Sequence, residues 1–228
     1  MKVQSTRDVA KLNKTNCIIY GESGIGKTKL VTTAPKPLII DSESGLLSVA
    51  DFDLDVVQAR SLKDTIEVYN FLANEKHDYE TVFVDSLSET AQIVLTEYKA
   101  KERDPRQAYQ KLGEEVISMV RKFKSLPMHV VFVAKQARLI DEFNGRTSYG
   151  PSFPGRMLDA ELPYQVDVLL AMRFHKHEGK QYRVLQTGVS IQYNAKDRSG
   201  LLDNLEKPDL SSIFEKISAG SIQAELKI

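Results

Sequence analysis

Gly21-Glu22-Ser23-Gly24-Ile25-Gly26-Lys27-Thr28 is the stretch from which the fold of this chain follows. It has the form G-x-x-x-x-G-K-T, the phosphate-binding loop (P-loop) of nucleoside triphosphatases. Its glycines let the backbone curl until successive N–H groups face one anion. Lys27 is then placed to reach the β- and γ-phosphates, and the Thr28 hydroxyl to bind Mg²⁺. We therefore expect all eight residues to bind ATP, with Lys27 also acting in catalysis.

The flanking sequence suits such a loop, which lies between a strand and a helix. The apolar run Cys17–Tyr20 precedes it, and Lys29-Leu30-Val31 is expected to open a helix after it. The alternative is an ordinary glycine-rich turn.

Composition limits the other possibilities. The 228 residues include 31 Lys and Arg against 31 Asp and Glu, so nucleic-acid binding would depend on a local basic patch. Cys17 is the only cysteine, which excludes an internal disulfide and fits a reducing cytoplasm. No apolar run approaches membrane-spanning length and no signal-peptide core follows Met1, so we expect no membrane partner. We expect 1–228 to form one domain, with 1–15 as a lead-in and 219–228 as a C-terminal tail.

Apolar runs alternate with helical spacing along the chain. Helices are expected after the P-loop, over 62–72, twice between 86 and 123, and over 209–217. Residues 137–163 are expected to be irregular, with a hairpin turn at Asn144-Gly145. The fold class is therefore α/β, with a mainly parallel twisted sheet, helices on both faces and an antiparallel C-terminal extension. Strands are expected at 17–20, 38–41, 54–59, 81–85, 128–134, 166–172 and 182–186.

Polar residues end three of the expected strands, where ligands of parallel sheets bind. Asp85 is expected to hold Mg²⁺, unless it only caps the helix that follows. Asp41 and Glu43 follow another strand, and a carboxylate there can orient or deprotonate an attacking water; the alternative is a pair of solvated loop acids. Gln136 ends a third strand, either as a sensor of the γ-phosphate or as a surface amide.

The order of these pieces resembles the core of RecA-type recombinases, over roughly residues 15–215. More narrowly, the chain resembles small phage-encoded proteins that consist of little more than this core and act in single-strand annealing and recombination. The runs that carry the resemblance are Gly21–Thr28, Leu38–Glu43, Val82–Ser86 and Val131–Arg138.

The resemblance implies further roles. Glu43 matches the family's catalytic glutamate, and Gln136 the glutamine that couples the γ-phosphate to DNA binding. Lys196 and Arg198 lie where the family places cations that reach a neighbouring subunit's nucleotide. The family's two DNA loops correspond to the segment after Gln136 and to the region around 99–111.

Basic residues occur in both expected DNA loops. Tyr149 and Phe153 are interleaved with the arginines of the later segment, and cations with aromatics suit single strands. The alternatives are a solvated helix end for 99–111 and an ordinary loop for the later segment. The expected DNA-binding residues are Lys101, Arg103, Arg106, Arg138, Arg146 and Arg156.

The sequence thus predicts an ATP- and Mg²⁺-dependent ATPase, stimulated by single-stranded DNA, that promotes strand annealing or homologous recombination. Its expected partners are single-stranded DNA, further copies of itself in a ring or filament, and a single-strand-binding protein. A phage origin would place it in the host cytoplasm. The alternatives are another nucleic-acid motor, such as a helicase or helicase loader, a small-molecule kinase, and a switch that binds ATP without hydrolysing it.

Overall fold

A computed structural model describes residues 14–141, 145–188 and 190–223. Every strand expected from the sequence is present within this part of the chain. The helical elements, including two 3₁₀ helices, are η1 (Thr28–Thr33), η2 (Leu46–Val49), α2 (Leu62–Asn74), α3 (Leu87–Lys101), α4 (Pro105–Lys124), α5 (Arg156–Gln165) and α6 (Leu210–Gln223). The strands are β1 (Asn16–Gly21), β2 (Pro37–Asp41), β3 (Asp55–Gln58), β4 (Thr81–Asp85), β5 (His129–Ile140), β6 (Thr147–Ser152), β7 (Val168–His177), β8 (Lys180–Gln186), β9 (Lys196–Asp197) and β10 (Leu205–Glu206).

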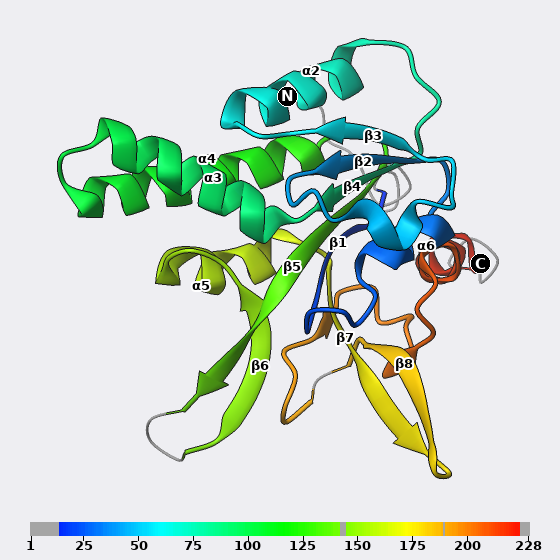
Figure 1. The fold of residues 1–228 in the computed structure, drawn as a ribbon. Coiled ribbons are helices and arrows are strands. Elements are labelled where there is room, and N and C mark those ends of the chain that lie inside the picture. The colour runs from blue at the N-terminus through cyan, green and yellow to red at the C-terminus, as the bar shows by residue number, and fades with distance from the viewer. Residues whose placement is uncertain (1–13, 142–144, 189, 224–228) are drawn as a thin grey trace, which may run out of the picture.

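All these strands belong to one sheet, with the order β10-β8-β7-β1-β5-β4-β2-β3 and with β6 and β9 paired to β5 and β7 (Figure 1). The six strands from β7 to β3 run parallel, whereas β6, β8, β9 and β10 pair antiparallel. The predicted fold class is confirmed: the chain has the mainly parallel sheet and C-terminal antiparallel extension of a RecA-like P-loop fold.

Helices cover both faces of the sheet. The group α2–α5 lies on one side, with α3, α4 and α5 at the left of Figure 1 and α2 at the top, and η1, η2 and α6 lie on the other side. The central strand β5 alternates between the two cores: Phe132 packs with α3 and α4, whereas Val131 and Val133 pack with η1 and α6. A strand covered on both faces needs apolar residues at every position, which explains why these strands read as continuous apolar runs.

The helices that follow the strands begin at identifiable caps. Ser61 and Ser86 each accept a hydrogen bond from the N–H three residues later, and Asp104 caps α4, whose first residue is Pro105. These side chains satisfy N–H groups that a helix cannot pair internally. The caps of α2 and α3 define where these helices leave the sheet edge, and Asp104 marks the turn from α3 into α4.

Three expectations about secondary structure were wrong. The helix expected after the P-loop is only the six-residue 3₁₀ helix η1, because Pro35 and Pro37 follow within a few residues and β2 begins there. The segment 137–163, expected to be irregular, contains the rest of β5, strand β6 and most of α5. The last helix continues to Gln223 rather than ending at 217. Asn144 and residues 1–13 and 224–228 of the expected lead-in and tail lie outside the described residues.

Among the residues that the structure describes, no helix is both long and apolar enough to cross a membrane.

The Cys17 thiol is buried in β1, and burial raises its pKa to about 12, so it is a core group.

His129, the first residue of β5, joins three parts of the chain. Its ring stacks on Phe214 of α6 at 3.9 Å between centroids, and its Nδ1 accepts the Thr15 N–H at 3.2 Å. Burial, together with the nearby charge of Lys14, lowers the pKa of His129 to about 4, with Glu80 opposing the shift. The folded protein therefore holds this imidazole neutral.

We predict that His129 makes the fold acid-sensitive. An unfolded chain binds a proton at this residue below about pH 6.5, which the folded chain resists, so stability should fall as the pH drops through 6.5 and level off near 4. The expected loss is roughly 2 kcal/mol between about pH 7 and pH 4.5. His129→Gln keeps an acceptor for Thr15 and should lose less stability over that range in urea unfolding. Equal pH dependence in the two proteins would contradict this assignment.

Candidate functional site

The C-terminal ends of β1, β2 and β4 and the middle of β5 meet at one cavity of about 620 Å³. It is the only described cavity that combines the P-loop with the strand-end residues singled out in the sequence. Its lining residues are Gly21, Glu22, Ser23, Gly24, Gly26, Lys27, Thr28, Glu43, Gly45, Ser48, Asp85, Ser86, Val133, Ala134, Lys135 and Gln136.

The P-loop follows β1 directly, and two of its glycines have backbone angles that other residues rarely adopt. Gly24 has φ of 75° and Gly26 of 105°. Gly21 is needed for a different reason, because a Cβ there would lie 2.5 Å from the Met172 carbonyl oxygen of the adjacent β7. The loop curls back on itself, and Lys27 Nζ donates to the carbonyl oxygens of Gly21 and Glu22, both at 2.8 Å. Burial lowers the pKa of Lys27, while Asp85 and Glu43 oppose that shift.

Thr28 and Asp85 are in direct contact. The Thr28 hydroxyl donates to Asp85 Oδ2 at 2.6 Å, although the two residues are 57 positions apart. The alternative role of Asp85 as a helix cap is excluded, because Ser86 Oγ is the group that caps α3. Asp85 is buried, and desolvation raises its pKa to about 6 against the opposing effects of Thr28 and Lys27.

Glu43 reaches the same cavity from the end of β2. Ser86 Oγ donates to Glu43 Oε1, and Lys135 Nζ lies 3.9 Å from that oxygen. Asp41 has a different position from the one expected, since it does not line the cavity. Its Oδ1 accepts the N–H groups of Glu43 and Ser44, and its Oδ2 pairs with Arg60 at 3.3 Å. Asp41 thus shapes the turn that presents Glu43.

Gln136 also lines the cavity, just past the last residue of β5 that pairs with β1 and where β5 pairs with β6. Its neighbour Lys135 was missed in the sequence, where nothing distinguishes it from a surface lysine. Lys135 Nζ pairs with Glu89 at 2.7 Å, and its N–H donates to Ser88 Oγ at 2.9 Å. Only the pattern Ser86-x-x-Glu89, a capping signature, could have indicated that this turn is ordered. Lys27 and Lys135 are the only cations among the described lining residues.

The donor set suits Mg²⁺. This ion prefers hard oxygen ligands and is usually held by one or two carboxylates together with substrate phosphates. The Thr28 hydroxyl and the Asp85 carboxylate supply such oxygens beside the loop. Among described residues, no cluster of three or more His, Cys, Asp or Glu forms a metal site, so an all-protein metal cage is not the arrangement here.

Lys196 and Arg198 lie at the other end of the sheet. Lys196 Nζ donates to the carbonyl oxygens of Pro163 and Val166, at 2.5 and 2.6 Å. Arg198 donates to the Tyr164 carbonyl at 2.8 Å and pairs with Asp167. Both cations therefore satisfy carbonyls at the end of α5, as cations near helix C-termini do. Their expected action on a neighbouring subunit's nucleotide stays a prediction.

The expected DNA-binding residues fall into two regions. Arg138 and Arg156 are exposed at β5 and at the start of α5, and Arg146 donates to the Ile191 carbonyl. Phe153, expected to interleave with them, is buried in the core and is not available to stack on a base.

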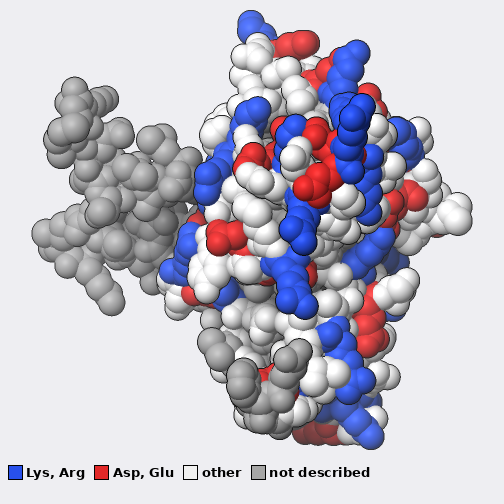
Figure 2. All heavy atoms as spheres, turned by 90° about the vertical axis from the view of Figure 1, so that its left-hand side faces the viewer, with Lys and Arg blue, Asp and Glu red and all other residues white. Residues whose placement is uncertain are grey.

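The earlier basic region, at the α3–α4 turn, is far from the cavity, since the 15-residue helix α3 separates them by about 22 Å. Lys101 lies 3.9 Å from Glu97, and Lys111 pairs with Glu102 at 2.7 Å, while Arg103 and Arg106 are exposed. This turn faces the viewer in Figure 2, where basic and acidic side chains are interspersed. The region is therefore not a surface of single charge.

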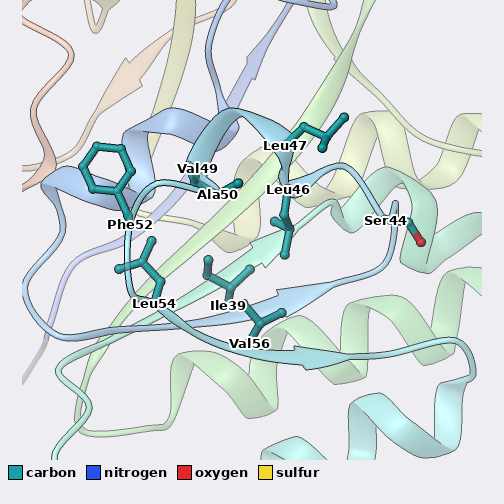
Figure 3. Close-up of a pocket in the computed structure, with 9 residues that line it drawn as sticks. All are labelled: Ile39, Ser44, Leu46, Leu47, Val49, Ala50, Phe52, Leu54 and Val56. Carbon is teal, nitrogen blue, oxygen red and sulfur yellow. The ribbon is translucent and has the colours of Figure 1, made fainter.

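A second cavity, of about 360 Å³, lies between η2 and β3 (Figure 3). None of the described residues that line it is charged, so this cavity does not suit a phosphate. Its lining residues are Ile39, Ser44, Leu46, Leu47, Val49, Ala50, Phe52, Leu54 and Val56.

Comparisons with known proteins give one family and several similar structures. A family model described as an AAA domain matches residues 13–199. A KaiC-like protein from the hyperthermophilic archaeon Pyrococcus horikoshii OT3 has 12% identity and a TM-score of 0.43, covering 76% of this chain and 77% of that one. The RadB recombinase has 15% identity and a TM-score of 0.45, covering 77% of this chain and 82% of that chain. A search of curated proteins found no match.

We predict that Asp85 lowers the stability of the protein without ligand. A carboxyl whose pKa rises to about 6 on folding opposes the folded state above that pH. Asp85→Asn should therefore raise the free energy of unfolding near pH 8 by about 1–3 kcal/mol, with the gain shrinking as the pH falls from 6 towards 4. Urea unfolding of wild type and variant near pH 8 and near pH 4 measures this difference in the free energy of unfolding. A variant less stable than wild type near pH 8 would show that Asp85 stabilises the loop instead.

Proposed function

This chain belongs to the AAA domain family. We propose that it is an ATPase that binds single-stranded DNA and promotes strand annealing or homologous recombination. The observation that carries the ATPase part is the 2.6 Å contact between the P-loop threonine, Thr28, and the strand-end acid, Asp85. A P-loop ATPase needs these two groups side by side, and chance placement of residues 57 positions apart does not account for the contact.

Lys27 would bind the phosphates. Its ammonium lies over the loop, where two neutral carbonyl oxygens are its hydrogen-bond partners. Phosphate oxygens carry negative charge and make stronger, charge-assisted bonds, so an entering nucleotide would take over these contacts. The loop N–H groups would cradle the same phosphates.

Glu43 would orient the attacking water and accept its proton. Two groups support that role: Ser86 Oγ, which donates to the carboxylate, and Lys135, whose charge lies 3.9 Å away. Both contacts hold the carboxylate at the cavity, where a general base must lie within reach of the water. Gln136, on the same cavity, would report whether the γ-phosphate is present to the β5–β6 hairpin, in which it pairs with Pro151.

Thr28 and Asp85 would hold Mg²⁺, which supplies neutralisation of phosphate charge when bound. The chain's own contribution is to keep these two oxygens together next to Lys27. The raised pKa of Asp85, about 6, means that its carboxylate is available for a cation at neutral pH and is progressively lost below that value.

Support for the DNA part comes from the exposed arginines of the β5–β6 hairpin and from the resemblance to recombinase cores. The same proposal includes self-assembly into a ring or filament, action beside a single-strand-binding protein, and a phage source. A helicase or helicase loader would share the site but would separate duplex strands. A small-molecule kinase would transfer the γ-phosphate to an acceptor instead of water.

One experiment separates these functions. ATP turnover is measured with single-stranded DNA, with duplex DNA and without DNA, alongside annealing of complementary strands and sizing by light scattering. Turnover stimulated by single strands, together with faster annealing, supports the proposal. Unwinding of a tailed duplex would favour the helicase, and turnover indifferent to DNA would remove the DNA part.

We predict that Glu43→Gln binds ATP normally but hydrolyses it more slowly by about 10²–10⁴-fold, the usual contribution of a general base. Lys27→Ala should lose turnover and ATP binding together, because phosphate contacts disappear. Asp41→Asn is the matched control for charge at the end of β2, since Asp41 holds the turn but does not line the cavity. Turnover within twofold of wild type in Glu43→Gln would return Glu43 to the role of a loop acid.

We predict that the β5–β6 hairpin and α5 contribute phosphate contacts through Arg138, Arg146 and Arg156. Replacing all three with Ala should weaken single-strand binding and reduce the log–log salt slope by roughly 0.7 per lost contact. Replacing Lys101, Arg103 and Arg106 provides a control of equal charge at the α3–α4 turn. An unchanged slope in the first variant, with a reduced slope in the control, would move the DNA site to that turn.

A further inference from the structure

A second hairpin, formed by β7 and β8, runs beside the P-loop strand on the opposite side from β5 and β6 (Figure 1). Residues directly opposite in an antiparallel pair share one face. One face therefore carries Arg173 together with the opposed pair His175 and Tyr182. The other carries the pair Phe174 and Arg183, which are in cation–π contact at 5.7 Å.

The first of these faces continues into the body of the protein. The Arg173 guanidinium lies 5.2 Å from the centre of the Tyr193 ring. It is held there by Gln186 Oε1, which accepts from Nε and Nη2 at 3.2 and 2.7 Å. Tyr193 in turn stacks on Tyr149 of β6, with ring centroids 5.3 Å apart and planes at 26°. The segment around Tyr193 thus bridges the two hairpins.

The line of side chains that runs from Arg173 through Tyr193 to Tyr149 ends on the β5–β6 hairpin. Arg138 is directly opposite Tyr149 and hence on the same face, and its Nη2 donates to Thr147 at 3.3 Å. Two arginines and four aromatic side chains therefore lie in one row from one hairpin to the other. We call this row the aromatic track, and its members are His175, Tyr182, Arg173, Tyr193, Tyr149 and Arg138.

The aromatic track is tied to the P-loop through one residue. The Tyr20 hydroxyl lies within hydrogen-bond distance of the carbonyl oxygens of Tyr149, at 2.9 Å, and Asn194, at 2.8 Å. Tyr20 is fully buried in β1, and Gly21, the first residue of the P-loop, comes next. A shift of the loop would thereby reach the backbone on which both stacked tyrosines are carried.

We propose that the aromatic track binds single-stranded DNA along its length, from the β7–β8 hairpin to the β5–β6 hairpin. The exposed Tyr182 ring offers a stacking surface to an unpaired base, whereas Tyr193 already packs between Arg173 and Tyr149 and forms the floor of the track. The interleaved cations neutralise phosphates, as in other single-strand grooves. The inference rests on the proposed function and assigns its DNA contact to a surface that includes β7 and β8. A duplex presents no free base faces, so the track discriminates in favour of single strands.

The hairpin itself supplies a matched pair of variants. Tyr182 and Phe174 are equally exposed, at 47% and 46%, and lie on opposite faces. Lys180 lies on the Tyr182 face and Lys176 on the Phe174 face. Tyr182→Ala/Lys180→Ala and Phe174→Ala/Lys176→Ala therefore each remove one ring and one charge from the same hairpin.

The test is binding of a labelled dT30 strand and of a 30-base-pair duplex by fluorescence anisotropy, with ATP affinity checked in each variant. We expect the Tyr182 variant to bind dT30 more weakly by about fivefold to a hundredfold, the effect of losing base stacking on one ring. Its duplex binding should change no more than that of the Phe174 variant, which should retain wild-type affinity for dT30.

Equal weakening of dT30 binding by the two variants, or no weakening by either, would overturn the track while leaving the proposed function in place. Failure of the wild-type protein to bind dT30, with or without ATP, would overturn both the aromatic track and the DNA part of the proposed function. Loss of single-strand and duplex binding to the same extent in the Tyr182 variant would show a purely electrostatic contact and would also overturn base stacking along the track.

Discussion

The hydrogen bond between Thr28 and Asp85 is the interaction on which the site depends. Thr28 lies in the loop after β1, and Asp85 is the last residue of β4; these strands are not neighbours, because β5 lies between them. Parallel strands bring their C-terminal ends to one edge. Gly21 pairs with Lys135 of β5, and Val84, the residue before Asp85, pairs with Phe132, so both strand ends lie within a few residues of one another along β5. Glu43 depends on the same contact indirectly, because Ser86, its hydrogen-bond partner, follows Asp85.

The charged side chains at the P-loop edge of the sheet suit the binding of a ligand more than the stability of the protein alone. Lys27 is partly buried and bonded to neutral carbonyls, and Asp85 is buried with a raised pKa. Each charge removed from water costs free energy unless a partner offsets the loss. The protein alone offsets it incompletely, whereas phosphates and Mg²⁺ would complete both charge pairs. Local frustration of this kind is expected at functional sites.

The two strands that flank β1 are the same two that continue into long hairpins. β5 pairs with β6, and β7 with β8, so the strand that carries the P-loop lies between them. Tyr20 and the segment around Tyr193 join the hairpins behind the loop. Nucleotide and DNA would therefore act on neighbouring strands of one rigid sheet, which is a short physical path for coupling.

The sequence by itself determined the parallel sheet, the position of the P-loop and three residues that line its cavity, Glu43, Asp85 and Gln136, because buried strands and phosphate loops impose residue types at short, regular spacings. It placed a strand end at Gln136, whereas β5 continues to Ile140 in the structure. It could not separate Asp85 as a cap from Asp85 as a partner of Thr28, or reveal Lys135, since both depend on contacts between distant strands. It placed Phe153 on a DNA surface where the structure buries it. The aromatic track also arose only from tertiary structure. Tyr149, Arg173 and Tyr193 are far apart in the sequence and come together through the order of the strands, so no short sequence pattern could have indicated their contact.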